Sequence, residues 1–245
     1  MRTEERADLV EHLDELRTRI IRSLAYIAVG GFAAWFCYDP LYHLLLAPVR
    51  ASLVAAQGKI IYNTQLEPFM TRLQVSVIAG IIAASPAVLW EVWRFVAPGL
   101  TDKERRAVRP LLPIAGTLFL AGVVLCYFIA PRGFVWLIGF APEGTEGYFT
   151  LQKQVTLIAK LALAFGLCFE LPLVLAFLVK VDVISADTLR RRRREAIVAI
   201  FFIAAAATPS TDWFTMMALA APMYALYEGT VWWAVITERR AKAHP

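Results

Sequence analysis

Apolar residues along this chain are gathered into long runs that short polar and charged segments separate. Several runs approach the roughly 20 apolar residues that a helix needs to cross a bilayer, which soluble domains do not sustain. Six runs are the most economical interpretation of the pattern. They cover residues 20–38, 69–93, 110–130, 155–179, 196–208 and 214–236. The sequence therefore predicts an all-α membrane protein with six transmembrane helices, as a single polytopic domain over residues 1–245.

The fifth and sixth predicted spans are short. The fifth, residues 196–208, rises only about 20 Å at about 1.5 Å per residue, whereas a hydrocarbon core is about 30 Å thick. A locally thinned bilayer, or flanking arginines that snorkel to the headgroups, would still let this segment span. The alternative is that the fifth and sixth runs form one re-entrant hairpin.

Positive charge is concentrated in alternate loops. Most of the 25 Lys and Arg residues lie in the N-terminal segment, the loops after the second and fourth runs, and the C-terminal tail. The positive-inside rule then places both termini in the cytoplasm, in agreement with an even number of spans. Residues 1–19 have apolar positions at helical spacing, which predicts a cytoplasmic amphipathic helix that lies at the membrane surface and runs into the first span.

Composition supports a membrane protein and excludes the common enzyme classes. The chain is 59% hydrophobic, with a net charge of +5. Its three cysteines, Cys37, Cys126 and Cys168, all lie in apolar runs, which argues against a disulfide framework. The sequence contains no metal-ligand spacing, no phosphate-binding loop, no HExxH and no nucleophile elbow. We therefore expect no enzymatic activity, no cofactor or metal, and no nucleic-acid partner.

Glu170 is a single acid inside the fourth apolar run, in the sequence AFGLCFELP. An ionised carboxylate at that depth is costly, so its side chain should face protein or water. Pro172 has no N–H, so we expect a break in the helix where the carbonyl of Cys168 loses its partner. Two interpretations stay open. Glu170 is either a protonated acid hydrogen-bonded to a neighbouring helix, or a polar notch that thins or hydrates the membrane or docks a polar residue of a partner.

Five segments together resemble the TatC family, the central subunit of the twin-arginine protein translocase. They are HLDELRTR at residues 12–19, WRFVAPGLTDKERR at 93–106, FGLCFELP at 165–172, TPSTD at 208–212 and PMYALYE at 222–228. The resemblance covers nearly the whole chain in the family's order. It implies a receptor for signal peptides with two adjacent arginines, and a core subunit that exports folded proteins across the cytoplasmic (inner) membrane using the proton-motive force.

The resemblance also implies partners: TatA-type and TatB-type single-span proteins, further copies of this chain, and membrane lipid. It places signal-peptide binding on the N-terminal segment and the first cytoplasmic loop. The implied residues are Glu15, Leu16, Arg17, Phe95, Glu104 and Arg105. Glu15 and Glu104 suit this role because a guanidinium fork can meet a carboxylate through two hydrogen bonds. Each acid also has a structural alternative: Glu104 can form a capping box with Thr101, and Glu15 can pair with Arg19 one turn later.

A second group of residues is implied in partner contacts within or near the membrane. These residues are Pro48, Tyr127, Glu170, Pro172, Thr208, Pro209 and Asp212. For Tyr127 the alternative is an interfacial aromatic residue, and for Pro48 it is a loop kink that interrupts a short amphipathic stretch. The family commonly has a glutamine a few residues after the aspartate, where this chain has Met216 and Met217. A partner would then contact Thr208, Thr215 or the shape of the surface instead.

Two further alternatives remain at this stage. A proton-coupled small-solute transporter would use Glu170 as its carrier site, but the chain shows no inverted repeat and its predicted cytoplasmic face is heavily charged. The arginine run at residues 190–194 is either a patch for anionic lipid or a topology anchor for a short span. The resemblance favours the receptor over the transporter.

Overall fold

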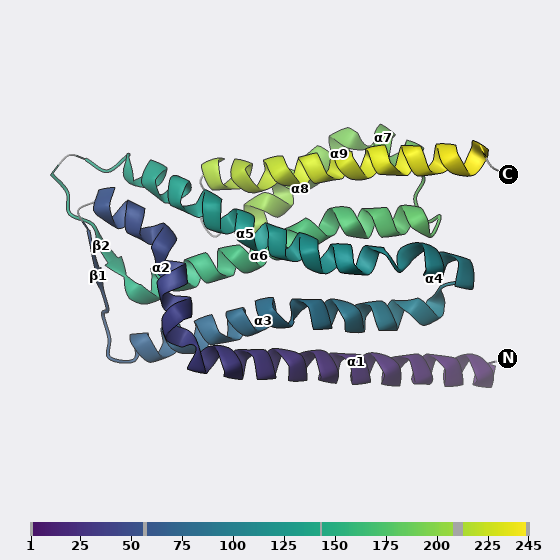
Figure 1. The fold of residues 1–245 in the computed structure, drawn as a ribbon, viewed down its shortest axis with the longest axis horizontal. Coiled ribbons are helices and arrows are strands. Elements are labelled where there is room, and N and C mark those ends of the chain that lie inside the picture. The colour runs from purple at the N-terminus through teal and green to yellow at the C-terminus, as the bar shows by residue number, and fades with distance from the viewer. Residues whose placement is uncertain (1, 56–57, 143, 208–212, 244–245) are drawn as a thin grey trace.

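The computed structural model describes residues 2–55, 58–142, 144–207 and 213–243, which are helical almost throughout. The helices are α1 (Arg2–Phe36), α2 (Tyr38–Ala55), α3 (Glu67–Val96), α4 (Asp102–Val108), α5 (Leu111–Ile138), α6 (Leu151–Lys180), α7 (Ala186–Arg191), α8 (Arg193–Ala207) and α9 (Trp213–Ala243). A short 3-10 turn, η1 (Ala97–Gly99), joins α3 to the α4 region. The long helices lie side by side, and both chain ends and α4 lie at the same end of the bundle (Figure 1).

Each of the six predicted spans corresponds to a helix. Among the described residues, three stretches are long and apolar enough to cross a membrane: Glu67–Gly99, Glu104–Ile138 and Leu151–Lys180. A fourth is counted if α1 and α2 form one bent span. The helix of the fifth predicted span, α8, has only 15 residues. The helix of the sixth predicted span, α9, has 31 residues and extends beyond the apolar run into the polar C-terminal segment.

The first two helices correct the expectations for the N-terminal part of the chain. α1 is unbroken from Arg2 to Phe36, so the amphipathic segment continues the axis of the first predicted span and is not a separate surface helix. α2 follows at an angle of 85°. Pro48 is buried inside α2 and does not interrupt it, so the predicted loop kink is wrong.

Two short strands modify the all-α prediction. β1 (Lys59–Ile61) and β2 (Tyr148–Thr150) pair in parallel, at the end of the bundle opposite α4 (Figure 1). The buried carboxylate of Glu67 strengthens this junction. It accepts one hydrogen bond from the backbone N–H of Asn63 at 2.9 Å and one from that of Gln152 at 3.0 Å. The loop after β1 is thereby tied to the beginning of α6.

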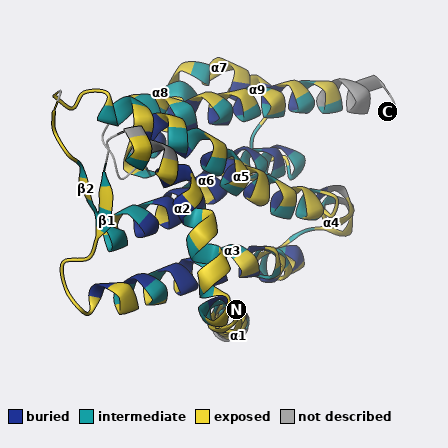
Figure 2. Ribbon diagram, turned by 60° about the vertical axis from the view of Figure 1, so that its left-hand side comes forward, coloured by how far each residue is buried: buried dark blue, intermediate teal, exposed yellow. Residues whose placement is uncertain are grey.

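The main apolar core lies among α2, α5, α6, α8 and α9, with Phe165, Ile158 and Met223 almost fully buried. α1 lies at the edge of the bundle and packs chiefly against α3 (Figure 1, Figure 2). Glycines allow the two backbones to approach: a methyl group on Gly30 would lie 3.0 Å from the carbonyl oxygen of Gly80, and one on Gly80 would overlap the backbone of Gly31. Small residues permit the same close packing in membrane helix pairs.

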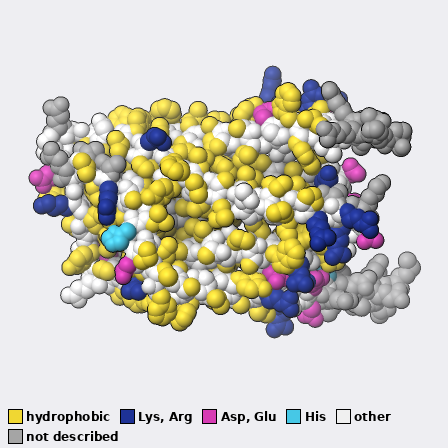
Figure 3. Space-filling model, viewed as in Figure 1, with side chains coloured by type: hydrophobic (Ala, Val, Ile, Leu, Met, Phe, Trp, Pro, Cys, Tyr) yellow, Lys and Arg dark blue, Asp and Glu magenta, His cyan; other side chains and the backbone are white. Residues whose placement is uncertain are grey.

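The surface is divided into an apolar middle and two charged ends (Figure 3). We call the end that carries α4, α7 and both chain termini the basic end. Its arginines include Arg94, Arg105, Arg106, Arg109 and the run at residues 190–194. The apolar middle has many exposed large side chains, such as Val29, Phe32 and Phe128. Such a band is suited to contact with lipid hydrocarbon.

Candidate functional site

A cavity of about 580 Å³ opens at the basic end between α1, α3, η1 and α4. Trp90 and Trp93 of α3 form part of its apolar lining. Its charged lining consists of Glu15, Arg19, Arg94, Asp102, Arg105, Arg106 and Arg109. Five arginines therefore face two acids in this cavity. Among the described residues, only Arg19 of these five forms an ion pair.

Arg19 joins two carboxylates that come from different helices. Its Nη2 lies 2.9 Å from Glu15 Oε1, one turn earlier in α1, and its Nη1 lies 2.9 Å from Glu91 Oε2 in α3. The Glu91 side chain is 2% exposed and the Glu15 side chain 29%. A carboxylate as buried as Glu91 is strongly destabilising without a cation, so Arg19 and Glu91 depend on each other.

Sequence reasoning missed Glu91. The only signal that pointed to it was a lone acid in the apolar sequence WEVW at residues 90–93, within the second predicted span. The same argument that singled out Glu170, the cost of an acid in a membrane span, applies to Glu91. The ion pair between Glu15 and Arg19, which was the structural alternative for Glu15, is present.

The other predicted residues of α1 and α3 lie around the cavity but do not line it. Leu16 is half-buried and Arg17 is exposed. The Phe95 ring stacks on His12, with ring centroids 4.5 Å apart and an interplanar angle of 22°. This stack joins α1 to α3 close to the Arg19 bridge.

Glu104 lies in the first turn of α4, and its predicted capping box with Thr101 is confirmed. Glu104 Oε2 accepts hydrogen bonds from the Thr101 hydroxyl at 2.7 Å and from the Thr101 N–H at 2.8 Å. These bonds favour the ionised form and hold the pKa of Glu104 below its usual value. Glu104 does not itself line the cavity, but Arg105, the next residue of α4, does. Capping therefore engages only Oε2 of the ionised Glu104 carboxylate, at the edge of the site.

Glu170 does not line this cavity but a second one of about 290 Å³ between α3, α4, α5 and α6, and Trp93 is common to the two linings. The rest of the lining is apolar and includes Val92, Ala115 and Leu173. Glu170 Oε1 is buried and accepts or donates no hydrogen bond within the described part of the chain. One interpretation expected a hydrogen bond from a neighbouring helix, and that bond is not formed at this oxygen.

The expected helix break beside Glu170 is wrong. α6 continues from Leu151 to Lys180 with Pro172 inside it. The hydroxyl of Thr230 on α9 lies 3.3 Å from the carbonyl oxygen of Pro172 and 3.0 Å from that of Leu226. This hydrogen bond joins α6 to α9 beside the proline, but it does not replace the bond lost at the carbonyl of Cys168, four residues before Pro172.

The remaining predicted partner-contact residues lie toward the other end of the bundle. The structure brings Pro48 of α2 and Tyr127 of α5 together in the lining of one cavity of about 330 Å³. Thr208, Pro209 and Asp212 lie outside the described residues. Thr215, which follows them, is buried on α9. Its methyl group lies close to Gly133 of α5, because a Cβ atom added at that glycine would be only 3.2 Å from it.

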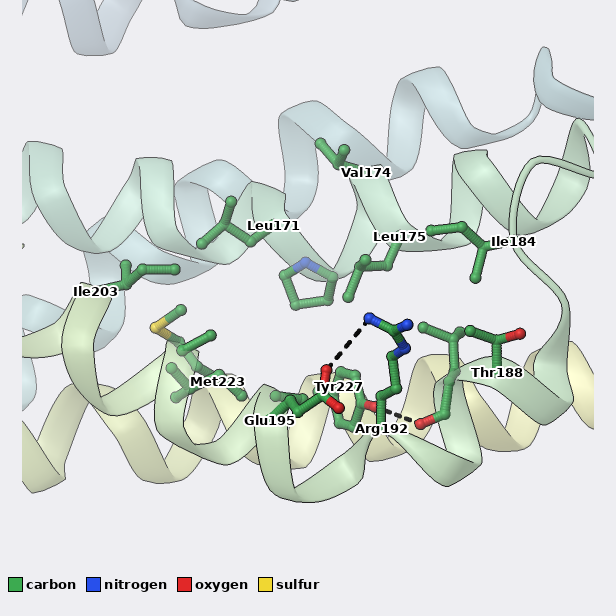
Figure 4. Close-up of a pocket in the computed structure, with 15 residues that line it drawn as sticks. Leu171, Val174, Leu175, Ile184, Thr188, Arg192, Glu195, Ile203, Met223 and Tyr227 are labelled. Carbon is green, nitrogen blue, oxygen red and sulfur yellow. Dashed lines mark hydrogen bonds and ion pairs between the residues drawn. The ribbon is translucent and has the colours of Figure 1, made fainter.

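A further, largely apolar cavity of about 570 Å³ lies among α6, α7, α8 and α9 (Figure 4). Its charged lining residues are Arg192 and Glu195, which pair at 3.3 Å. The Tyr227 hydroxyl donates a hydrogen bond to the Leu189 carbonyl at 2.7 Å. Two more arginines of the run are paired, Arg191 with Asp187 and Arg193 with Glu228, at 2.8 and 2.7 Å.

The fold and the cavity define a multi-helix membrane protein with an arginine- and glutamate-lined site at its basic end. Comparison with known proteins identifies the family. The model of the family "Sec-independent protein translocase protein (TatC)" matches residues 11–222. The TatC of Desulforapulum autotrophicum is 39% identical over 230 residues, which cover 93% of this chain and 84% of that protein. The TatC of Escherichia coli is 32% identical over 230 residues, 93% of this chain and 88% of that protein.

A solved structure agrees with the sequence comparison. A crystal structure of the twin arginine translocase receptor TatC in DDM matches with a TM-score of 0.79 and 32% identity, over 91% of this chain and 99% of that chain. The chain therefore belongs to the TatC family, and the resemblance seen in its motifs is confirmed. It is a component of the Sec-independent protein translocase, and its family is therefore one of protein transporters rather than enzymes.

The capping box predicts a pH-dependent α4. Because the pKa of Glu104 is lowered on folding, its stabilisation is complete above the ordinary carboxyl value and is lost as the pH falls through the lowered folded value. Hydrogen–deuterium exchange of the α4 amides, corrected for intrinsic rates, should show protection that is constant near neutral pH and decreases below about pH 4.5. Thr101→Val removes the hydroxyl, so it should lower the protection of the α4 amides at neutral pH. It should also reduce the further loss of protection on acidification. Identical profiles for both proteins would contradict the assignment.

Proposed function

We propose that this chain is the signal-peptide receptor and core subunit of a twin-arginine translocase that exports folded proteins across the cytoplasmic membrane, driven by the proton-motive force. In this proposal the chain spans the membrane six times with both termini in the cytoplasm. The positive-inside rule supports this orientation, because the arginine-rich end carries both termini. TatA-type and TatB-type proteins, further copies of the chain and membrane lipid are the expected partners.

The observation that carries the proposal is the position of Glu15 in the wall of the basic-end cavity, beside Trp90 and Trp93. A signal arginine that enters the cavity finds a carboxylate that can accept two hydrogen bonds from its guanidinium. Indole faces in the lining can hold the same flat cation by cation–π attraction. A lysine in the same place keeps the charge but presents no planar fork.

The second arginine of the signal has a second acceptor in this proposal. Glu104 stays ionised at neutral pH, and its capping bonds engage only one of its two oxygens. It belongs to the same helix as the cavity residues Asp102 and Arg105. A guanidinium at the cavity edge can therefore meet Glu104 without unwinding the first turn of α4.

The rival transporter function has less support. A carrier site for a small solute would need polar groups around Glu170, and the other residues that line its cavity are apolar. The family match and the acid-bearing cavity at the basic end both favour the receptor.

Recognition can be tested by co-purification with a precursor that carries Arg-Arg or Lys-Lys in its signal. The Arg-Arg precursor should be captured preferentially. Glu15→Gln should lower its capture by at least about tenfold, because one charge-assisted hydrogen-bonded contact contributes about 1.5–3 kcal/mol. Glu104→Gln keeps the cap but loses the charge, so it should also weaken capture if Glu104 binds the signal.

The matched control for these variants is Asp187→Asn, an exposed acid at the same end that is paired with Arg191, and it should leave capture unchanged. Equal capture of the Arg-Arg and Lys-Lys precursors by the unmodified chain would remove the receptor function. Unimpaired capture by Glu104→Gln alone would restrict Glu104 to capping.

Glu170 is proposed to act after recognition, as a buried polar notch between α3, α5 and α6. Glu170→Ala should leave capture of the Arg-Arg precursor intact and reduce its export by at least about tenfold, since removal of an intramembrane acid eliminates the polar group of that cavity. Leu173→Ala, in the same cavity, changes volume without removing charge and is the control. Loss of capture by a folded Glu170→Ala protein would show that recognition and the later step are not separated.

A further inference from the structure

The carboxylate proposed to receive a signal arginine is already in contact with an arginine of the chain itself. Arg19 Nη2 lies 2.9 Å from Glu15 Oε1. A bidentate guanidinium contact needs both oxygens of a carboxylate. A signal arginine therefore cannot make its full contact with Glu15 until Arg19 releases that oxygen.

We propose that Arg19 is an internal competitor of the signal arginine for Glu15, and that Glu91 is the acceptor that retains Arg19 when the signal binds. This inference rests on the proposed function and names two further residues that set its affinity. Arg19 occupies Glu15 in the empty site. Signal binding exchanges one guanidinium for another at Glu15 and leaves Arg19 paired with Glu91.

The geometry of the bridge makes this exchange feasible. Arg19 contacts the two acids through different nitrogens, Nη2 for Glu15 and Nη1 for Glu91, so the first contact can open while the second persists. A guanidinium that moves away from Glu15 can meet Glu91 end-on through Nη1 and Nη2, so the nitrogen released by Glu15 gains a new acceptor.

Burial fixes which of the two contacts opens. The Glu91 side chain is 2% exposed, whereas that of Glu15 is 29% exposed and lines the cavity. Opening the Arg19–Glu91 contact would leave an unpaired charge in a buried position, at high cost. Opening the Arg19–Glu15 contact exposes Glu15 to the cavity, where water or a signal arginine can reach it.

Competition also predicts how selectivity changes. Arg19 occupies one of the two Glu15 oxygens, which a signal arginine needs for its two-point contact, whereas a signal lysine can bind the other oxygen. Arg19 therefore weakens binding of the Arg-Arg signal more than that of the Lys-Lys signal and lowers their affinity ratio. A residue that instead oriented Glu15 for a bidentate contact would strengthen Arg-Arg binding and increase that ratio.

The test uses the full chain in detergent and fluorescent signal peptides that carry Arg-Arg or Lys-Lys. Arg19→Gln together with Glu91→Gln removes the competitor and the buried acid that needs it, and leaves two amides of similar size. The double variant should bind the Arg-Arg peptide roughly twofold to fivefold more tightly, the gain expected from removing one partly exposed ion pair, and the Lys-Lys peptide by less, so that their affinity ratio increases. The paired control Arg193→Gln with Glu228→Gln removes another ion pair and should change neither affinity.

Glu91→Gln alone keeps the Arg19–Glu15 pair and provides a second measurement if the double variant is unstable. Arg19 then has Glu15 as its only acid partner, so both peptides should bind more weakly. Tighter or unchanged binding by Glu91→Gln, or weaker Arg-Arg binding by a double variant of unchanged thermal stability, would overturn the proposal. Equal binding of the two peptides by the unmodified chain would instead contradict the proposed function itself.

Discussion

The contact between Arg19 and the buried carboxylate of Glu91 joins two of the helices that line the basic-end cavity. α1 lies at the edge of the bundle and packs chiefly against α3, and close glycine contacts set the distance between the two backbones. A carboxylate that is 2% exposed requires its cation, so Arg19 is held at Glu91 and reaches Glu15 from there. The same packing of α1 on α3 places Glu15 in the cavity wall and His12 on the Phe95 ring.

The bundle separates two kinds of polar group. Acids and arginines at the basic end surround a cavity that α1, α3, η1 and α4 form, and Glu104 fixes the first turn of α4 by capping. Glu170 lies in a different, otherwise apolar cavity, against an α6 helix that Pro172 leaves intact. This separation supports a division between recognition of the signal and a later step of transport.

Sequence patterns predicted a helix at each of the six apolar runs, which are α1, α3, α5, α6, α8 and α9, and the capping box of Thr101 and Glu104, because both depend on local spacing. They missed Glu91, since its partner Arg19 is 72 positions away and a lone acid has no periodic signal. They also missed the β1–β2 pair, which joins two distant loops. The break expected at Pro172 was wrong: α6 continues through the proline and packs against α3, α5 and α9.

The central claim is that the arginine pair of the signal binds in the basic-end cavity, and photo-crosslinking tests it most directly. A signal peptide would carry a photoreactive residue directly after its two arginines, and mass spectrometry would locate the crosslinked positions on the full chain. The account predicts crosslinks to residues that line this cavity and not the Glu170 cavity, such as Trp90 and Arg94, and these crosslinks should be lost with a Lys-Lys peptide. Crosslinks concentrated on Leu173 and the rest of the Glu170 cavity, or equal yields from both peptides, would contradict it.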